Sequence, residues 1–245
     1  MIMDQQKEIE VIKEGDYRPT KVGLAHLGER PGSTEGRIFD VDASITKGEK
    51  RRRVHLIHKV LDLPQTAGIL VERHQAAKEA GLPVPATFRM SRDDNGMIGI
   101  LMTDLTEGKK NLFMESGYAL LNDSWRKVLA KTDFDHYFDP ADPQNIGLLS
   151  SRATGKGIRL SVDSVGFILK PDGANKLFIF DFGWVLLGTK LPDGGYRFIT
   201  GGPDFWDDKT EFVLTKDELD KKNIEVLRGE VEGMMEFKAD PDQEF

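Results

Sequence analysis

The chain has 245 residues, of which 39% are hydrophobic and 31% are charged, and its 41 acidic and 34 basic side chains give a net charge of -7. This composition predicts a globular protein of one large domain or two packed lobes, and its acidic balance argues against a broad nucleic-acid-binding or membrane-binding surface. The absence of cysteine excludes disulfides, zinc-thiolate sites and cysteine nucleophiles.

The N-terminal stretch MIMDQQKEIE is acidic and polar, which is unlike a signal peptide. No apolar run reaches the roughly 18 residues that a membrane-spanning helix needs. We therefore expect a cytoplasmic protein.

Two strands are predicted between Ile9 and Val41, separated by the glycine-rich loop HLGERPGSTEGRIF. Backbone N–H groups at Gly28, Gly32 and Gly36 would cover the phosphates of a nucleotide, although the spacing differs from G-x-G-x-x-G. An ordinary turn is the alternative. The basic run KGEKRRR that follows is predicted to be a solvated hairpin tip.

The next strand is predicted at VHLIHKVL, Val54 to Leu61, where period two places His55, Ile57 and Lys59 on one face. Lys59 either extends its ammonium group to solvent or serves as a point charge for phosphate oxygens.

A helix is predicted from Thr66 to Ala80 and ends at Gly81. The expected inward stripe is Ile69, Glu72, Ala76 and Ala80. An inward carboxylate needs a partner, and Lys59 is the candidate for Glu72.

The segment ERHQAAKEAGLPVPATFRM resembles the helix-to-strand passage of aminoglycoside-phosphotransferase-type kinases, which belong to the protein-kinase-like superfamily. There a glutamate lies nine residues before the glycine of a G-L-P-V-P turn, and Glu72 and Gly81 keep that separation, 81 − 72 = 9. A hairpin turn at Asp93 to Gly96 and a strand from Met97 to Met102 then run into Thr103-Asp104-Leu105, which resembles the hinge of the same superfamily.

The resemblance implies that Lys59 binds phosphate, that Glu72 positions Lys59, and that Asp104 lies at the hinge beside the nucleotide. One residue departs from the pattern. A small alanine usually stands two residues before the lysine, and here that residue is Ile57. The larger side chain would crowd the adenine base.

One or two helices are predicted between Asn111 and Lys131, from the spacing of Leu112, Tyr118, Leu121, Trp125 and Leu129. A catalytic loop is then expected in one of two registers. In the first, HYFDPADPQNIGLL runs into an apolar strand, Asp139 orients or deprotonates the acceptor hydroxyl, and Asn145 binds metal together with Asp181. This register needs an inserted hairpin, for which residues 150–157 are available.

In the second register the loop is LSVDSVGFILK, followed by a turn at Pro171-Asp172-Gly173. Asp163 is then the candidate base, and its separation from Asp181 suits the family better. Phe167 stands where the family has its metal-binding asparagine, so this register implies an unconventional site. A structural turn acid is the alternative role for Asp163.

The segment KLFIFDFGWV is predicted to be a buried strand that carries Asp181 at its end. Asp181-Phe182-Gly183 resembles the metal-binding D-F-G element of the same superfamily. A carboxylate on a rigid strand end suits a hard cation such as Mg²⁺.

Beyond this element, LPDGGYRFIT contains a turn between strands, and GGPDFWDDKTEF is predicted to be a loop. A capping box at Thr215 to Glu218 opens a helix that runs to about Phe237, followed by an acidic tail from Ala239. The predicted buried stripe of this helix is Leu219, Ile224, Leu227, Val231 and Met235.

These observations predict an α+β, two-lobed, protein-kinase-like fold with a reduced C-terminal lobe. Residues 1–105 form the nucleotide-binding lobe, a β-sheet plus one helix, and residues 106–245 form the second lobe. The expected activity is ATP- and Mg²⁺-dependent phosphoryl transfer to a hydroxyl of an unidentified protein or small molecule. The alternatives are an inactive, pseudokinase-like interaction module and an unrelated α+β binding protein.

Overall fold

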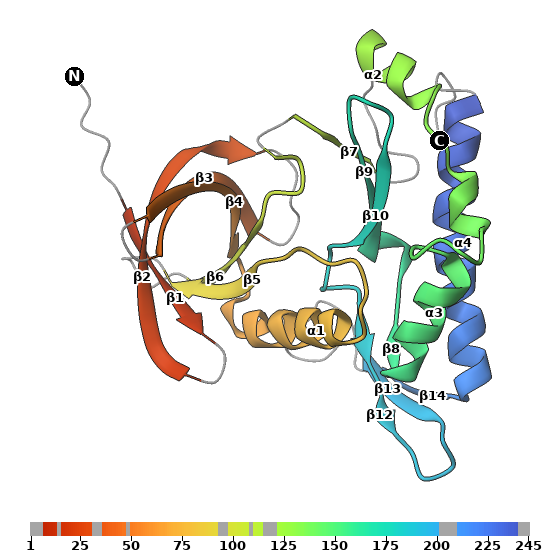
Figure 1. Cartoon of the computed structure of the whole chain (residues 1–245). Helices are drawn as coiled ribbons and strands as arrows, with labels where there is room; N and C mark the ends of the chain where they lie inside the picture. Colours follow the sequence, from red (N-terminus) through yellow and green to blue (C-terminus); the bar gives the residue numbers. More distant parts are fainter. Residues whose placement is uncertain are drawn as a thin grey trace. The chain divides into compact units, whose positions relative to one another are not determined.

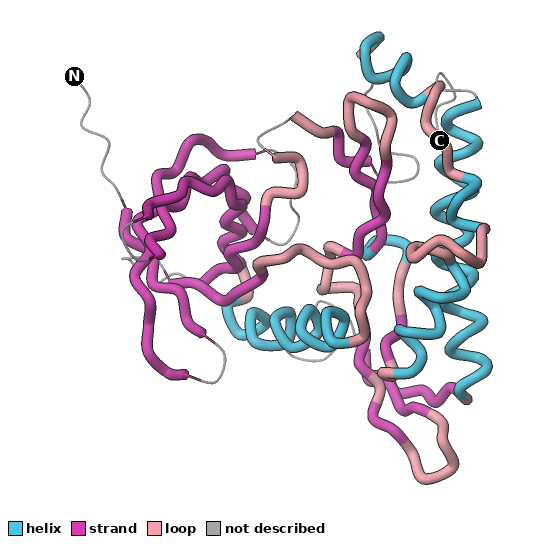
Figure 2. Tube along the Cα trace, in the orientation of Figure 1, coloured by secondary structure: helices cyan, strands magenta, loops and turns pink. Residues whose placement is uncertain are grey.

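The computed structural model of the chain describes residues 7–13, 16–30, 36–47, 50–92, 98–107, 110–114, 122–200 and 210–239. Within these residues the protein is α+β, as predicted, with four α-helices and several antiparallel sheets (Figure 1, Figure 2). The chain forms two compact units. Unit 1 comprises residues 1–72 and 85–108, and unit 2 comprises residues 73–84 and 109–245. The sequence placed a single division near Leu105 and did not predict that residues 73–84 belong with the second unit.

Unit 1 is a closed barrel of antiparallel strands in the order β1-β2-β3-β4-β6-β5 (Figure 1). Its strands are β1 (Lys7–Lys13), β2 (Asp16–Arg30), β3 (Gly36–Lys47), β4 (Lys50–Leu61), β5 (Phe88–Arg92) and β6 (Ile98–Thr103). The sequence predicted two strands before Val41, and the structure has three. The additional strand β1 pairs with both β2 and β5, which closes the sheet and leaves no open edge.

The glycines that were predicted to form one loop occupy different structural positions. Gly28 lies within β2, next to an irregularity in its pairing with β3, and Gly36 begins β3. Gly32 lies outside the described residues. The predicted hairpin at the basic run is confirmed, because β3 and β4 pair as far as Lys47 and Lys50. The turn predicted at residues 93–96 also lies outside the described residues, between the paired strands β5 and β6.

The predicted alternation in β4 is confirmed, and its buried face is the one that carries Leu56, His58 and Val60. His58 is fully buried, and its Nε2 lies 2.9 Å from the hydroxyl of Ser91 on β5. Gly99 on the intervening strand β6 makes room for this contact, since a Cβ there would lie 2.6 Å from His58 Nε2. The barrel thus has a polar pair in its interior.

Helix α1 (Ala67–Glu79) confirms the predicted helix, and Gly81 ends it in the left-handed region with φ +73°. The predicted inward stripe is wrong. The buried positions of α1 are Ala67, Leu70, Arg73, His74 and Ala77. They follow i, i+3, i+4 spacing in a register one residue later, so Glu72 is exposed.

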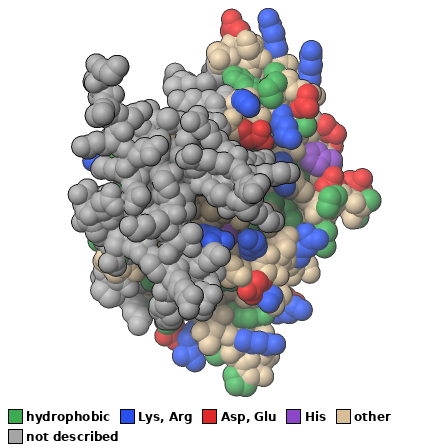
Figure 3. Space-filling model, turned by 60° about the vertical axis from the view of Figure 1, so that its left-hand side comes forward, with side chains coloured by type: hydrophobic (Ala, Val, Ile, Leu, Met, Phe, Trp, Pro, Cys, Tyr) green, Lys and Arg blue, Asp and Glu red, His purple; other side chains and the backbone are tan. Residues whose placement is uncertain are grey.

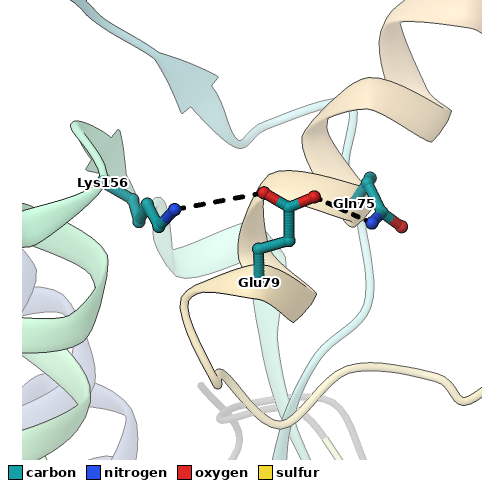
Figure 4. A network of polar contacts seen from close by, with 3 residues as sticks. All are labelled: Gln75, Glu79 and Lys156. Carbon is teal, nitrogen blue, oxygen red and sulfur yellow. Dashed lines mark hydrogen bonds and ion pairs between the residues drawn. The ribbon is translucent and has the colours of Figure 1, made fainter.

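The second half of α1 belongs to unit 2, where polar contacts connect it to neighbouring segments (Figure 4). Glu79 accepts a hydrogen bond from Gln75 at 2.9 Å and lies 4.0 Å from the ammonium group of Lys156. Arg152 donates to the carbonyl oxygen of Gly81 at 3.2 Å. The ion pair is about half exposed and contributes little, on the order of 0–1 kcal/mol.

Unit 2 contains a three-stranded sheet in the order β10-β9-β7. Its strands are β7 (Leu112–Met114), β9 (Val165–Leu169) and β10 (Asn175–Ile179). The predicted hairpin with a turn after Lys170 is confirmed, and Gly173 supplies its φ of +88°. The helices predicted for residues 111–131 are only partly present, because residues 112–114 form a strand and α2 spans Asp123–Leu129. Residues 115–121 lie outside the described part.

The strand and inserted hairpin predicted for residues 146–157 are wrong, because a helix, α3 (Ile146–Gly155), occupies most of this segment. A 3-10 helix, η2 (Asp135–Phe138), precedes α3. The buried positions of α3 are Ile146, Leu149, Ser150, Ala153 and Thr154, a helical spacing. A short apolar run such as the one at the start of α3 is compatible with either a strand or a helix, because it is too short for its periodicity to separate them.

Helix α4 (Lys216–Ala239) confirms the long C-terminal helix and its capping box. The Thr215 N–H donates to Glu218 Oε2 at 2.8 Å, and the Glu218 N–H donates to Thr215 Oγ1 at 3.2 Å. Of the predicted stripe, Leu219, Leu227 and Val231 are buried, whereas Ile224 and Met235 are partly exposed. The other buried residues of α4 are Asn223, Glu230, Met234 and Phe237.

Hydrogen bonds from the Asn223 side chain connect α4 to the segment that contains strand β8 (Ile158–Arg159). Its Oδ1 accepts from the Leu160 N–H at 2.9 Å, and its Nδ2 donates to the Ile158 carbonyl at 2.8 Å. β8 pairs with β11 (Leu186–Leu187), which follows the Asp181 segment. Helices α3 and α4 lie side by side next to this pair (Figure 1).

A second three-stranded sheet contains β12 (Thr189–Lys190), β13 (Tyr196–Thr200) and β14 (Thr210–Leu214). The predicted turn between strands is confirmed at residues 191–195, with Gly194 at φ +88°. Residues 210–212 were predicted to be the end of a loop and belong to β14 instead. Residues 201–209 and the tail from residue 240 lie outside the described residues. No helix in the described part of the chain is long and apolar enough to cross a membrane.

Candidate functional site

The β9–β10 hairpin carries two acids at its open end. The Phe180 N–H donates to the Ser164 carbonyl at 3.1 Å, so the pairing continues one residue beyond the strands. Asp163 directly precedes Ser164, and Asp181 directly follows Phe180, so the two acids come next along the two paired segments. The hairpin therefore delivers both acids to the same end of unit 2.

The two acids differ in their surroundings. Asp163 is exposed and lies on a short 3-10 turn, η3 (Val162–Ser164). This turn is fixed by Ser164, whose hydroxyl donates to the Ser161 carbonyl at 2.6 Å and accepts from the Ser161 N–H at 3.1 Å. Asp181 is partly buried, and its Oδ1 accepts from the Gly183 N–H at 3.0 Å. A bond of this kind orients an aspartate within a tight turn.

Two residues of helix α1 contact the turn that follows Asp181. Arg73, which is 7% exposed, donates through Nη1 to the carbonyl oxygens of Phe182 at 3.0 Å and Gly183 at 2.8 Å. The ring of His74 meets the buried ring of Phe182 edge-on, with 5.1 Å between centroids. A charged donor on a helix thus fixes two successive backbone carbonyls beside the acid.

The sequence did not single out Arg73, His74 or Ser164. The first two sit three and four residues after Leu70, on the apolar face of α1, and that spacing was the available signal. The signal was missed because the inward register was assigned to Glu72.

The predicted nucleotide-binding residues all lie in unit 1. Lys59 is partly buried on β4, on the opposite face from His58, and Glu72 is exposed on α1. Asp104 is 3% exposed, and its Oδ1 accepts from the Thr106 N–H at 2.9 Å and the Thr106 hydroxyl at 2.7 Å. The carboxylate of Asp104 therefore organises a turn after β6. Roles for these residues in nucleotide binding remain predictions.

The acid and the amide of the first predicted register have local structural roles. Asp139 is exposed, and its Oδ1 accepts from the Ala141 N–H at 2.9 Å. Asn145 is the N-cap of α3, where its Oδ1 accepts from the Leu148 N–H at 3.1 Å and its Nδ2 donates to the Tyr137 carbonyl at 3.3 Å. An asparagine directly before a run of helical apolar spacing is an N-cap signal that the sequence contained.

Phe167 belongs to the core. It is fully buried, and its ring meets the rings of Phe134 and Tyr137 edge-on, each at 5.7 Å. Burial raises the pKa of the Tyr137 hydroxyl far above its usual value, and that hydroxyl donates to Asn175 Oδ1 at 2.6 Å. The position where the resemblance implies a metal-binding amide is thus filled by an apolar side chain.

Among the described residues, no group of three or more Asp, Glu, His or Cys side chains is placed to hold a metal ion. The acids at the hairpin end are a pair. Mg²⁺ commonly uses only one or two protein carboxylates and completes its shell with water and phosphate oxygens. Two carboxylates are the number that a magnesium-phosphate site commonly uses, and they are too few for a cation cage made of protein ligands alone.

Comparison with known proteins assigns the chain to no family, since no family model matches it and no curated protein matches it. Its function is therefore inferred from the residues and the geometry.

Proposed function

We propose that the chain is an atypical phosphotransferase that uses ATP and Mg²⁺ and acts on a hydroxyl group of a protein or small molecule. The observation that carries the proposal is the placement of Asp163 and Asp181 at one end of the β9–β10 hairpin. Support also comes from the chain order of β4, α1, the β5–β6 hairpin and the segment after Thr103, which is the order that the kinase resemblance implies.

In this proposal Asp181 and Asp163 hold the divalent cation, which neutralises charge on the phosphates when it is bound. The hydrogen bond from the Gly183 N–H to Asp181 and the two hydrogen bonds from Arg73 keep residues 181–183 in one conformation before substrate binds. Such preorganisation is what positions charge in phosphoryl transfer, where the protein contributes little covalent chemistry.

Asp163 also takes up the proton of the acceptor hydroxyl, since it is the exposed acid of the pair. The acceptor oxygen forms a bond to the terminal phosphorus, the bond from that phosphorus to the bridging oxygen breaks, and ADP leaves.

The second candidate is a pseudokinase-like module that keeps the fold and transfers nothing. Two observations favour it: Phe167 fills the position of the metal-binding asparagine, and Asn145 is engaged as a helix cap. Such a module would bind a nucleotide or a partner protein without turnover.

Nucleotide-dependent thermal stabilisation and transfer of labelled terminal phosphate from ATP separate the two candidates. The phosphotransferase proposal expects stabilisation by Mg²⁺-ATP and measurable transfer. It also expects Asp163→Asn to weaken the stabilisation in part, because one cation ligand is lost, while transfer falls about 10²-fold or more. Binding without transfer favours the module, and neither binding nor transfer contradicts both.

Asp172→Asn is the matched control. Asp172 is an exposed acid at the turn end of the same hairpin, where its Oδ1 accepts from the Ala174 N–H at 3.0 Å. Asparagine keeps that acceptor, so this variant changes the charge of the hairpin without touching the proposed site.

A further inference from the structure

Unit 2 contains a hollow of about 520 Å³ at the turn end of the β9–β10 hairpin. Lys170 and Lys176 line it from the hairpin, and Arg152 lines it from α3. Asp163 and Asp181 follow the other end of the paired strands, and neither of them lines the hollow. Every residue that lines it belongs to unit 2.

Basic side chains dominate the charge of the hollow. The three basic side chains of Arg152, Lys170 and Lys176 line it together with His136, and the acid among the lining residues is Asp142. Asp142 is engaged locally, since its Oδ1 accepts from the Gln144 N–H at 2.7 Å. In a chain of net charge -7, this concentration of positive charge is a local departure from the average. On the face drawn in Figure 3, acidic and basic side chains are interspersed among the coloured residues.

The guanidinium of Arg152 is held in place, because its Nη1 donates to the Gly81 carbonyl at 3.2 Å and to the Pro143 carbonyl at 3.5 Å. Lys170 and Lys176 are exposed and lie on either side of the turn that connects β9 and β10. A concave surface lined mainly by one sign of charge focuses its potential and attracts counter-ions of the opposite sign. A fixed guanidinium beside two ammonium groups suits a doubly charged oxyanion.

Part of the wall is apolar. Leu82 and Leu149 are buried residues that line the hollow, and Pro83 and Pro143 add further apolar surface. A volume of this size holds an organic molecule, since small-molecule sites commonly measure about 300–1,000 Å³. The chemistry therefore fits a ligand that has an anionic head and an apolar body.

We propose that this hollow binds a small phosphorylated organic molecule, with its phosphoryl group on Arg152, Lys170 and Lys176 and its apolar body against Leu82 and Leu149. The site does not depend on the phosphotransferase proposal, because it uses neither Asp163 nor Asp181.

Titration calorimetry with phenyl phosphate, inorganic phosphate and phenol tests the proposal on the full chain. We expect saturable binding of phenyl phosphate, weaker binding of inorganic phosphate and no binding of phenol. The double variant Lys170→Gln/Lys176→Gln should weaken phenyl phosphate binding about tenfold or more, since each removed cation takes away one charge-assisted contact. Both lysines are exposed, so this variant should fold.

The double variant Lys221→Gln/Lys222→Gln makes the same change of net charge on the exposed face of α4 and should leave the affinity within about twofold. Equal losses in both double variants would overturn the proposal, since they would reflect the overall charge alone. No binding of phenyl phosphate would also overturn it. Equal affinities for phenyl phosphate and inorganic phosphate would contradict the role of the apolar wall.

Discussion

Replacing Arg73 with methionine should destabilise unit 2 by about 1–5 kcal/mol. The change removes both hydrogen bonds to the carbonyls of Phe182 and Gly183 while it keeps an unbranched side chain of similar reach. Hydrogen bonds that involve a charged group contribute about 1.5–3 kcal/mol each, which gives roughly 3–6 kcal/mol for two. Burial of the methionine side chain offsets about 1–2 kcal/mol of that loss.

Urea unfolding followed by tryptophan fluorescence measures this effect. All three tryptophans of the chain, at positions 125, 184 and 206, belong to unit 2, so the signal reports that unit. Arg73→Lys should fall between wild type and Arg73→Met, because an ammonium group lacks the planar fork of a guanidinium. Arg228→Met, on the exposed face of α4, is the control and should change stability by less than about 0.5 kcal/mol. A free energy of unfolding for Arg73→Met within about 0.5 kcal/mol of the wild-type value would refute a stabilising role for the two hydrogen bonds from Arg73.

Three further substitutions test other parts of unit 2. Asn223→Ala leaves the Leu160 N–H and the Ile158 carbonyl without their side-chain partner and should lower the free energy of unfolding in urea by about 2–4 kcal/mol. A decrease below about 1 kcal/mol would contradict the role of Asn223 in connecting α4 to the segment around β8. Gly166→Ala places a Cβ 2.7 Å from the ring of Phe113 and should lower stability by about 1–3 kcal/mol in thermal melts, whereas an unchanged melt would show that the ring can move. Hydrogen bonds from Thr215 lower the pKa of Glu218 below its usual 4.5, so the stability that ionised Glu218 adds is present above pH 4.5 and is lost as the pH falls through its folded pKa. Wild type should therefore exceed Glu218→Gln in stability at neutral pH and lose that advantage in acid, and a difference that does not vary with pH would contradict the capping role.

Local patterns predicted much of the fold of this chain. The alternation around His58, the glycine after α1, the turn after Lys170 and the capping box at Thr215 all depend on neighbouring residues, and the structure has each of them. Elements of this kind can be predicted because their signals lie within a few residues of one another.

The features that sequence reasoning missed depend on distant parts of the chain. Closure of the barrel needs β1 to pair with β5 across most of unit 1, and no local pattern specifies that pairing. The inward face of α1 is set by what packs against it, which places Arg73 inside and Glu72 outside. The short apolar run at the start of α3 was ambiguous between strand and helix until the N-cap role of Asn145 was visible.

The placement of the candidate site was predicted in part. The sequence offered two partners for Asp181 and could not decide between them. Hairpin pairing brings Asp163 to the same end as Asp181, whereas Asn145 caps a helix. A register of this kind follows from backbone pairing, which spacing along the chain only approximates.

The central claim is that Asp181 and Asp163 hold a divalent cation together with a nucleotide at the end of the β9–β10 hairpin. Binding of Mn²⁺, used as a paramagnetic substitute for Mg²⁺, measured by electron paramagnetic resonance in the presence of ATP tests it most directly. We predict that wild type and Asp172→Asn bind Mn²⁺ equally well, that Asp163→Asn weakens this binding, and that Asp181→Asn weakens it about tenfold or more. Mn²⁺ affinity in Asp181→Asn equal to that of wild type would contradict the account.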